Sequence, residues 1–289
     1  MKKNKKATGY RQTIEIPKSI RLTGKVLQSL SPALATRYAA RLFISPFRYP
    51  LPGREQHMDE RSRQHKHTVS GIGKEIVVYE YGESVHRVLL VHGWSGRGTQ
   101  LVKIADALLE AGYATVSFDA PAHGKAPGKT SDMSEFIDAA MMLEKEYGPF
   151  KAAIGHSLGG MTLLNAVKKG MQLEKLVTIG AGDMVEDIAV DFVRMLQLRD
   201  DIGIHIKKDF DRRIGFDINQ LSASIAAPEV DIPTLVIHDE DDLDVPVSAA
   251  RNIAAHLPDG RLTITSGLGH RKILGDPGVI EKIITFINN

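Results

Sequence analysis

The stretch Gly155-His156-Ser157-Leu158-Gly159 carries the G-x-S-x-G pattern, a serine between two glycines. Residues 152–154 before it are apolar and typical of a strand, and the residues after it are rich in apolar side chains and favour a helix. Between a strand and a helix, this pattern predicts a turn so tight that the serine hydroxyl projects beyond the edge of the sheet. We therefore interpret Ser157 as a candidate nucleophile. A glycine-rich turn with a capping serine is the simpler alternative.

Outward from this turn, short β-rich runs alternate with helical stretches from residue 75 to the end of the chain. This alternation predicts the α/β class, with a mostly parallel sheet covered by helices. Several runs are almost wholly apolar, as strands buried on both faces should be. The expected strands are residues 76–81, 87–92, 114–119, 152–156, 176–180, 234–238 and 262–265. The expected helices are residues 100–111, 134–147, 158–170, 248–256 and 277–287.

With Leu89-Leu90-Val91-His92-Gly93-Trp94 added to the serine motif, residues 75–289 resemble the α/β-hydrolase superfamily of serine esterases and lipases. The resemblance implies the α/β-hydrolase fold and an oxyanion hole made by the backbone N–H groups of Trp94 and Leu158. Two preorganised donors are needed because acyl transfer places a negative charge on the former carbonyl oxygen. A plain turn at the end of a strand is the alternative reading of His92-Gly93.

The resemblance also implies a triad acid in the loop His238-Asp239-Glu240-Asp241-Asp242-Leu243-Asp244-Val245-Pro246. Alignment on His238 and on Val245-Pro246 selects Asp242, and it places Asp239 where the family usually has glycine. Because this loop holds several carboxylates, Asp241 and Asp244 are the alternatives, and Asp183 occupies the position that some family members use. A solvated acidic loop or a cation site is the structural alternative.

The expected base is His270, which follows the last predicted strand after Gly267-Leu268-Gly269. The resemblance implies that His270 takes the proton of Ser157 and returns it to the leaving group, while the acid fixes the tautomer of the imidazole. His156 is expected to be a packed or hydrogen-bonded residue of the core.

Residues 184–228 interrupt the strand and helix alternation and are too long for a plain connection. We interpret them as a small helical cap insertion over the candidate nucleophile. The apolar residues of one helical face recur at helical spacing, namely Ile188, Phe192, Met195 and Leu196. Phe192, Met195 and Trp94 are therefore the candidate substrate-binding residues. A helix that packs on the sheet without touching substrate is the alternative.

Residues 1–74 form a basic extension that we expect to be helical and packed on the catalytic domain, residues 75–289. Residues 1–70 hold 15 Lys and Arg against 4 Asp and Glu, and the remainder holds 22 against 31. Residues 24–44 favour one or two helices, with Pro32 early in a helix after Ser31. One helical face is apolar, with Leu27, Leu30, Leu34, Tyr38, Leu42 and Phe43. We expect that face to be buried, and we favour this structural role over an arm that contacts anionic lipid or nucleic acid.

The amino-acid composition narrows the classes of protein and of functional site that remain possible. Of the 289 residues, 43% are hydrophobic and 25% are charged, which is ordinary for a globular protein. The absence of cysteine excludes disulfides and a cysteine nucleophile. No apolar run is long enough to span a membrane, and the lysine-rich start lacks the apolar core of a signal peptide, so we expect a soluble, cytoplasmic protein. No metal-ligand, P-loop or dinucleotide motif is present, and we expect neither a cofactor nor a nucleic-acid partner.

These observations together predict a serine hydrolase that cleaves a carboxylic ester, or a thioester, through an acyl-enzyme. The expected partner is a small-molecule ester, whose identity the sequence does not indicate. An acyltransferase or a carbon–carbon hydrolase on the same triad is the alternative within catalysis. A non-catalytic ligand sensor with this fold is the alternative from another class.

Overall fold

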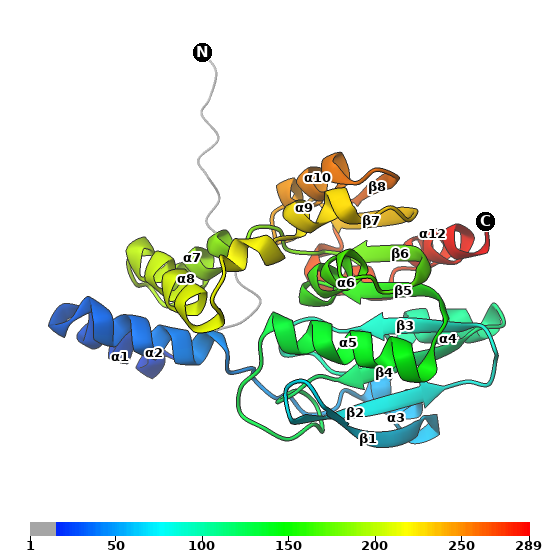
Figure 1. Ribbon diagram of the computed structural model, residues 1–289, viewed down its shortest axis with the longest axis horizontal. Helices are drawn as coiled ribbons and strands as arrows, with labels where there is room; N and C mark the ends of the chain where they lie inside the picture. The colour runs from blue at the N-terminus through cyan, green and yellow to red at the C-terminus, as the bar shows by residue number, and fades with distance from the viewer. Residues whose placement is uncertain (1–15) are drawn as a thin grey trace, which may run out of the picture.

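The computed structural model describes residues 16–289 and contains one eight-stranded sheet (Figure 1). Its strand order is β1-β2-β4-β3-β5-β6-β7-β8. β2 runs antiparallel to both β1 and β4, and all other neighbours are parallel. The strands are β1 Arg63–Val69, β2 Lys74–Tyr81, β3 Arg87–Val91, β4 Ala114–Asp119, β5 Phe150–His156, β6 Leu173–Ile179, β7 Thr234–Asp239 and β8 Gly260–Thr265. The predicted mostly parallel α/β sheet is confirmed.

Helices cover both faces of this sheet, because its central strands are apolar on both sides. One core cluster joins the sheet to α5 Met133–Tyr147, α6 Leu158–Lys168, α9 Ala223–Ala226 and α10 Val247–His256. A second cluster on the opposite face involves α3 Gln56–Arg61, α4 Val102–Glu110, α12 Pro277–Asn288 and the short turn η4 Ile273–Gly275. The parallel strands therefore end at a common edge, where ligands of open α/β sheets bind.

The sheet begins earlier than residue 75. β1, residues Arg63–Val69, pairs along its length with β2 and forms an edge of the sheet. Its sequence RQHKHTV has only Val69 buried, and we expected no strand there. The polar character of an edge strand exposed to water explains why the hydrophobic pattern did not indicate it.

The insertion after β6 consists of helices, of which α7 Val185–Met195 and α8 Asp200–Ile214 are the longest. The short turns η2 Ile218–Leu221 and η3 Ala227–Glu229 flank α9 and lead back to β7. In Figure 1, α7 and α8 lie beyond the carboxyl end of the sheet, away from its other flanking helices. The cap is thus separate from the two helical layers and lies near the end of β5.

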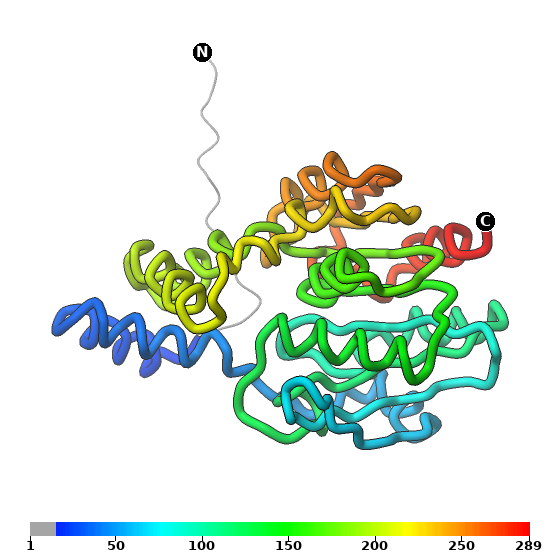
Figure 2. The backbone as a smooth tube through the Cα atoms, viewed as in Figure 1, coloured from blue at the N-terminus to red at the C-terminus, as the bar shows by residue number. Residues whose placement is uncertain are grey.

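The N-terminal part of the described chain forms a helical hairpin of α1 Lys18–Leu30 and α2 Pro32–Phe43. Figure 2 shows this hairpin beside α7 and α8, and its buried residues share a cluster with the cap, not with the sheet. Ala35 and Ala39 of α2 pack there with Val193 and Ile202 of the cap. The short turn η1 Gly53–Glu55 then leads the chain back to the sheet.

The expectation for the apolar face of this hairpin is only partly met. Leu27, Leu42 and Phe43 pack against the cap cluster, but Leu30 and Leu34 are exposed. The two helices turn at Ser31, so residues from α1 and α2 do not share one continuous face. The lysines at positions 2, 3, 5 and 6 of the basic extension lie outside the described residues. Within residues 16–289, no helix is long and apolar enough to cross a membrane.

Candidate active site

Ser157 lies where β5 ends and α6 begins, in a backbone conformation that L residues rarely adopt, with φ 54° and ψ −118°. The turn is held by a hydrogen bond from the Ser157 N–H to the carbonyl oxygen of Ile179, at 2.9 Å. Gly159 makes the turn possible, because a Cβ there would lie 2.2 Å from the carbonyl oxygen of Val91. Backbone strain of this kind gathers at functional sites.

The turn after β3 lies against the serine. A Cβ on Gly93 would come 3.0 Å from Cβ of Ser157 and 3.2 Å from the carbonyl oxygen of His156, so a larger residue would require these neighbours to shift. The N–H of Gly93 donates to Oε1 of Gln100 at 3.0 Å. The N–H groups of Trp94 and Leu158, in contrast, donate to no acceptor within residues 16–289. The two donors expected from the sequence therefore have no hydrogen-bond acceptor in the described part of the chain.

Residues 44–55, which follow the N-terminal hairpin, brace that turn. The N–H of Phe47 donates to Oγ of Ser95 at 2.9 Å, next to Trp94. The buried carboxylate of Glu55 accepts a hydrogen bond from the Thr99 hydroxyl at 2.8 Å. The extension therefore contacts the turn that carries Trp94. The sequence pattern did not indicate this contact.

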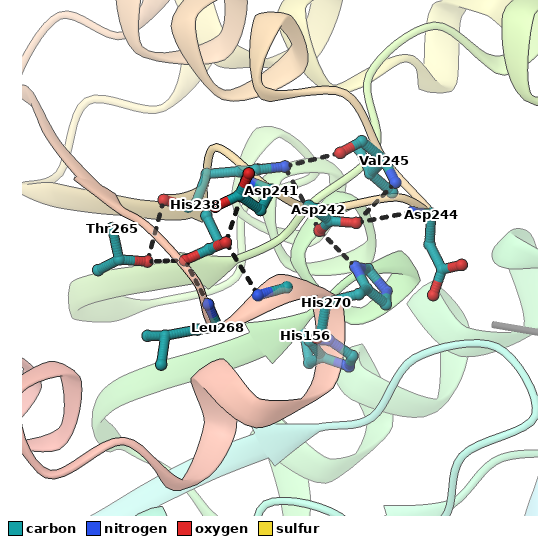
Figure 3. A network of polar contacts seen from close by, with 11 residues as sticks. His156, His238, Asp241, Asp242, Asp244, Val245, Thr265, Leu268 and His270 are labelled. Carbon is teal, nitrogen blue, oxygen red and sulfur yellow. Dashed lines mark hydrogen bonds and ion pairs between the residues drawn. The ribbon is translucent and has the colours of Figure 1, made fainter. Parts of the chain in front are cut away.

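Asp242 and His270 meet at the carboxyl edge of the sheet (Figure 3). Nδ1 of His270 donates to Oδ2 of Asp242 at 2.7 Å, and Oδ1 of Asp242 accepts the N–H groups of Asp244 and Val245 at 2.8 and 2.9 Å. Burial raises the pKa of Asp242, but the hydrogen bond and charge of His270, with those N–H donors, outweigh it, so its pKa lies below the ordinary value. The acid is held as a carboxylate, and Nε2 of His270 is left for another partner.

His270 and Ser157 line the same cavity. No hydrogen bond joins their side chains within the described part of the chain. Contacts of this kind are often loose in free enzymes and tighten on substrate binding.

Two of the alternative acids, Asp241 and Asp183, are engaged elsewhere. Oδ2 of Asp241 accepts the N–H of Gly267, and Asp183 accepts the N–H of Ser224 and the side-chain amide of Asn252. Of Asp183, Asp241 and Asp242, only Asp242 bonds to His270 within residues 16–289. A cation site is not formed by this loop either, because the described residues contain no group of ligands arranged to hold a metal ion.

Asp239 has a role that the sequence did not indicate. Its carboxylate accepts the Thr265 hydroxyl at 2.7 Å and the N–H groups of Leu268 and Gly269 at 3.1 and 2.9 Å (Figure 3). Burial raises its pKa, but these donors outweigh burial and lower it. Asp239 thereby fixes the loop that carries His270, and the only available signal was an aspartate where the family usually has glycine.

His156 is buried, as expected, and supports the same loop. Its Nε2–H donates to the carbonyl oxygen of His270 at 2.9 Å, and the two rings lie 4.6 Å apart. Burial, with the nearby His270, lowers the pKa of His156 to about 3. A second buried histidine, His123, packs against Trp94, and burial lowers its pKa to about 4.

These two histidines predict a pH dependence of stability. Both stay neutral in the folded protein below their ordinary pKa of 6.5, whereas the unfolded chain binds protons there. The unfolded state thus holds more protons, and the free energy of unfolding must fall as the pH falls below 6.5. We expect a loss of roughly 1 to 2 kcal/mol per histidine by about pH 5, measured by urea unfolding.

The variant His123→Gln isolates this effect from that of the carboxylates. It removes one of the titrating groups, so its stability should change less between about pH 7 and about pH 5 than that of the wild type. The comparison uses the change with pH and is independent of any loss of stability at neutral pH. The same pH dependence in both proteins would contradict the assignment.

A cavity of about 1330 Å³ opens above the serine, and it is larger than most small-molecule pockets, which hold roughly 300–1,000 Å³. The three candidate substrate-binding residues Trp94, Phe192 and Met195 line it. Ile188 also lines it, but Leu196 is buried in the cluster between the cap and the N-terminal hairpin. The expectation that Leu196 faces the pocket is wrong, because the opposite side of α7 packs against that hairpin.

The model of the alpha/beta hydrolase family matches residues 88–281, which include the serine, the acid and the histidine. The chain belongs to this family. A search of curated proteins finds no match to this alpha/beta hydrolase.

Solved structures of other alpha/beta hydrolases share the fold at low identity. An esterase from Pyrococcus furiosus is 16% identical, with a TM-score of 0.65 over 85% of this chain and 97% of its own. A bromoperoxidase from Bacillus anthracis is 18% identical, with a TM-score of 0.61 over 78% of this chain and 100% of its own. A putative lipase from Acinetobacter baumannii is 16% identical, with a TM-score of 0.60 over 83% of this chain and 97% of its own. At these identities the similarity shows the fold alone.

Proposed function

We propose that this alpha/beta hydrolase cleaves carboxylic esters through an acyl-enzyme on Ser157. The observation that supports this most is the Asp242–His270 pair, joined at 2.7 Å, in the same cavity as a serine with strained backbone. The fold alone does not decide the reaction, since it carries many chemistries. An esterase and a putative lipase among its structural neighbours agree with the proposal.

In the proposed reaction, Oγ of Ser157 attacks the ester carbonyl while Nε2 of His270 takes its proton. The negative charge that forms on the carbonyl oxygen is bound by the N–H groups of Trp94 and Leu158. The alcohol leaves with the proton from His270, and an acyl-enzyme remains. Water then attacks this ester with His270 again as base, and Ser157 leaves with the proton as the acid product is released.

The cavity supports an ester with a large apolar group. Apolar side chains from three separate parts of the chain line it: Leu42 and Phe43 of α2, Phe192 and Met195 of α7, and Leu243 after β7. Burial of a chain of methylene groups against such a wall contributes about 0.8 kcal/mol for each group. We therefore propose medium- to long-chain esters as substrates, in preference to acetate esters.

A fluorophosphonate probe separates catalysis from ligand sensing. Mass spectrometry of the labelled protein should find the probe on Ser157, because only an activated serine reacts with it. Absence of labelling would favour the non-catalytic sensor. Product analysis with an added alcohol, in the presence of water, separates a hydrolase from an acyltransferase, since the latter forms a new ester.

The cap residue Met195 provides a prediction about chain length. Met195→Trp reduces the space in the cavity, so we expect roughly a tenfold loss of kcat/KM for a decanoyl ester relative to an acetyl ester. Lys208→Trp, an exposed position on α8 outside the cavity, is the matched control and should leave this ratio unchanged. Equal ratios in both variants would mean that α7 does not contact the acyl group.

A further inference from the structure

The α1–α2 hairpin has two different faces. Its inner face packs on the cap, with Gly24 of α1 buried. Its outer face exposes Leu22, Val26 and Leu30, which lie one helical turn apart and are 64%, 50% and 71% exposed. These large side chains form one apolar stripe along α1, and Leu34 of α2, 42% exposed, lies beyond its end. Contiguous exposed apolar side chains surrounded by polar residues mark interaction sites on protein surfaces.

Positive charge surrounds that stripe. Residues 16–54 contain seven Lys and Arg and no Asp or Glu. Lys18 flanks the stripe on α1, and Arg37 and Arg41 are exposed on α2. Lys25 is also exposed on α1, and its Nζ donates to the neutral Oε1 of Gln197 at 2.6 Å. None of these four forms an ion pair with a carboxylate within residues 16–289, whereas most exposed arginines of the cap do so. The hairpin is therefore a cationic surface without counter-charges in the described chain.

The same hairpin reaches the cavity above Ser157. Leu42 and Phe43 at the end of α2 line that cavity, and so do Phe47 and Tyr49, which are exposed at its rim. The Phe43 end of the hairpin therefore lies at the cavity, whereas Leu30 and Leu34 lie at its opposite end, beside the turn at Ser31.

We propose that the outer face of the α1–α2 hairpin docks this protein on an anionic lipid surface. Leucine and valine side chains enter the boundary between headgroups and acyl chains, while the flanking lysines and arginines bind the anionic headgroups. The apolar stripe distinguishes this occupant from a nucleic acid, which is bound through its phosphates by polar and cationic side chains. A second copy of the hairpin is disfavoured, because the two positive surfaces repel each other.

This docking is independent of the proposed ester hydrolysis, although the two functions fit each other. The sequence favoured burial of the whole apolar face over contact with a membrane surface. The structure separates these two roles, because burial concerns the inner face and the exposed stripe lies on the outer face.

Vesicle sedimentation with the full chain tests the proposal. We expect binding to phosphatidylcholine vesicles that contain about one third phosphatidylglycerol, and at least tenfold weaker binding to phosphatidylcholine alone. Binding should weaken when the salt concentration rises from about 0.1 M to about 0.5 M, since salt screens the headgroup charge. Binding to neither vesicle, or equal binding to both, would overturn the proposal.

Two sets of variants locate the surface. Leu22→Ser/Val26→Ser/Leu30→Ser should weaken binding at least tenfold, whereas Val85→Ser/Leu262→Ser, at exposed apolar positions elsewhere, should not. Lys18→Glu/Arg37→Glu should abolish binding, whereas Lys169→Glu/Lys282→Glu makes the same change in net charge on other surfaces and should retain it. Equal losses in test and control variants would overturn the proposal.

Two further measurements distinguish the other outcomes. Sedimentation of the free protein reveals self-association, and a dimer that the serine variants dissociate would assign the stripe to a second copy instead. Hydrolysis of a soluble short-chain ester should be unchanged in every docking variant, because none of these residues lines the cavity. If the wild type binds vesicles but hydrolyses no ester, docking stands and the proposed function fails.

Discussion

Ser157→Ala is expected to reduce ester hydrolysis by a factor on the order of 10⁴ to 10⁶. The side chain loses a single oxygen that makes no hydrogen bond within the described residues, so the fold and the melting temperature should be unchanged. The loss is large because without Oγ no acyl-enzyme forms, and only the oxyanion donors and substrate binding remain. Steady-state kinetics on a decanoyl ester, with circular dichroism as the check on folding, measures the effect.

Ser248→Ala is the matched control for this variant. Ser248 is exposed and lines the same cavity, so the control removes the same atom from another position of that cavity. Its turnover should stay within a factor of about three, because a surface hydroxyl contributes little. If Ser157→Ala retains activity within tenfold of the wild type, the assignment of the nucleophile is wrong.

Asp242→Asn is expected to lower kcat by about 10⁴, as the equivalent aspartate-to-asparagine change does in a serine protease. The amide retains an oxygen for the N–H groups of Asp244 and Val245. It no longer provides a carboxylate for Nδ1 of His270, so it favours the wrong tautomer of the imidazole. Nε2 then carries a proton and is unable to accept the one from Ser157.

Asp241→Asn and Asp183→Asn are the controls that test which aspartate is the triad acid. Both residues accept hydrogen bonds from groups other than His270, so kcat should fall less than tenfold in either variant. If Asp241→Asn or Asp183→Asn loses activity while Asp242→Asn remains active, the triad acid is Asp241 or Asp183 and not Asp242.

The parallel part of the sheet could be predicted because its strands are buried on both faces and are therefore apolar. The acid–histidine pair could be predicted for a different reason. The family pattern, aligned on His238 and Val245-Pro246, selects Asp242, and Nε2 of His238 does donate to the carbonyl oxygen of Val245 at 3.0 Å. That hydrogen bond holds the loop in the conformation that presents Asp242 to His270.

Other features depend on contacts between distant segments, which a single sequence does not encode in a local pattern. The strand Arg63–Val69 is polar because it lies at an exposed edge. The amphipathic hairpin indicated that some surface must cover it, but not that this surface is the cap. The role of Asp239 arises from backbone N–H groups of the loop at Leu268 and Gly269, and a backbone donor leaves no trace in the identity of its residue.

The packing of the N-terminal hairpin on the cap also has a consequence for biosynthesis. α2 ends at Phe43, whereas α7 begins at Val185, so the ribosome adds about 140 residues between the two partners. At an elongation rate of roughly 5 to 20 residues per second, about 7 to 30 seconds pass between the synthesis of the hairpin and that of α7. Throughout that interval the side of α2 that holds Ala35, Ala39 and Phe43 faces water or a chaperone. The helices of the N-terminal hairpin are thus able to complete their packing only after the cap has been synthesised.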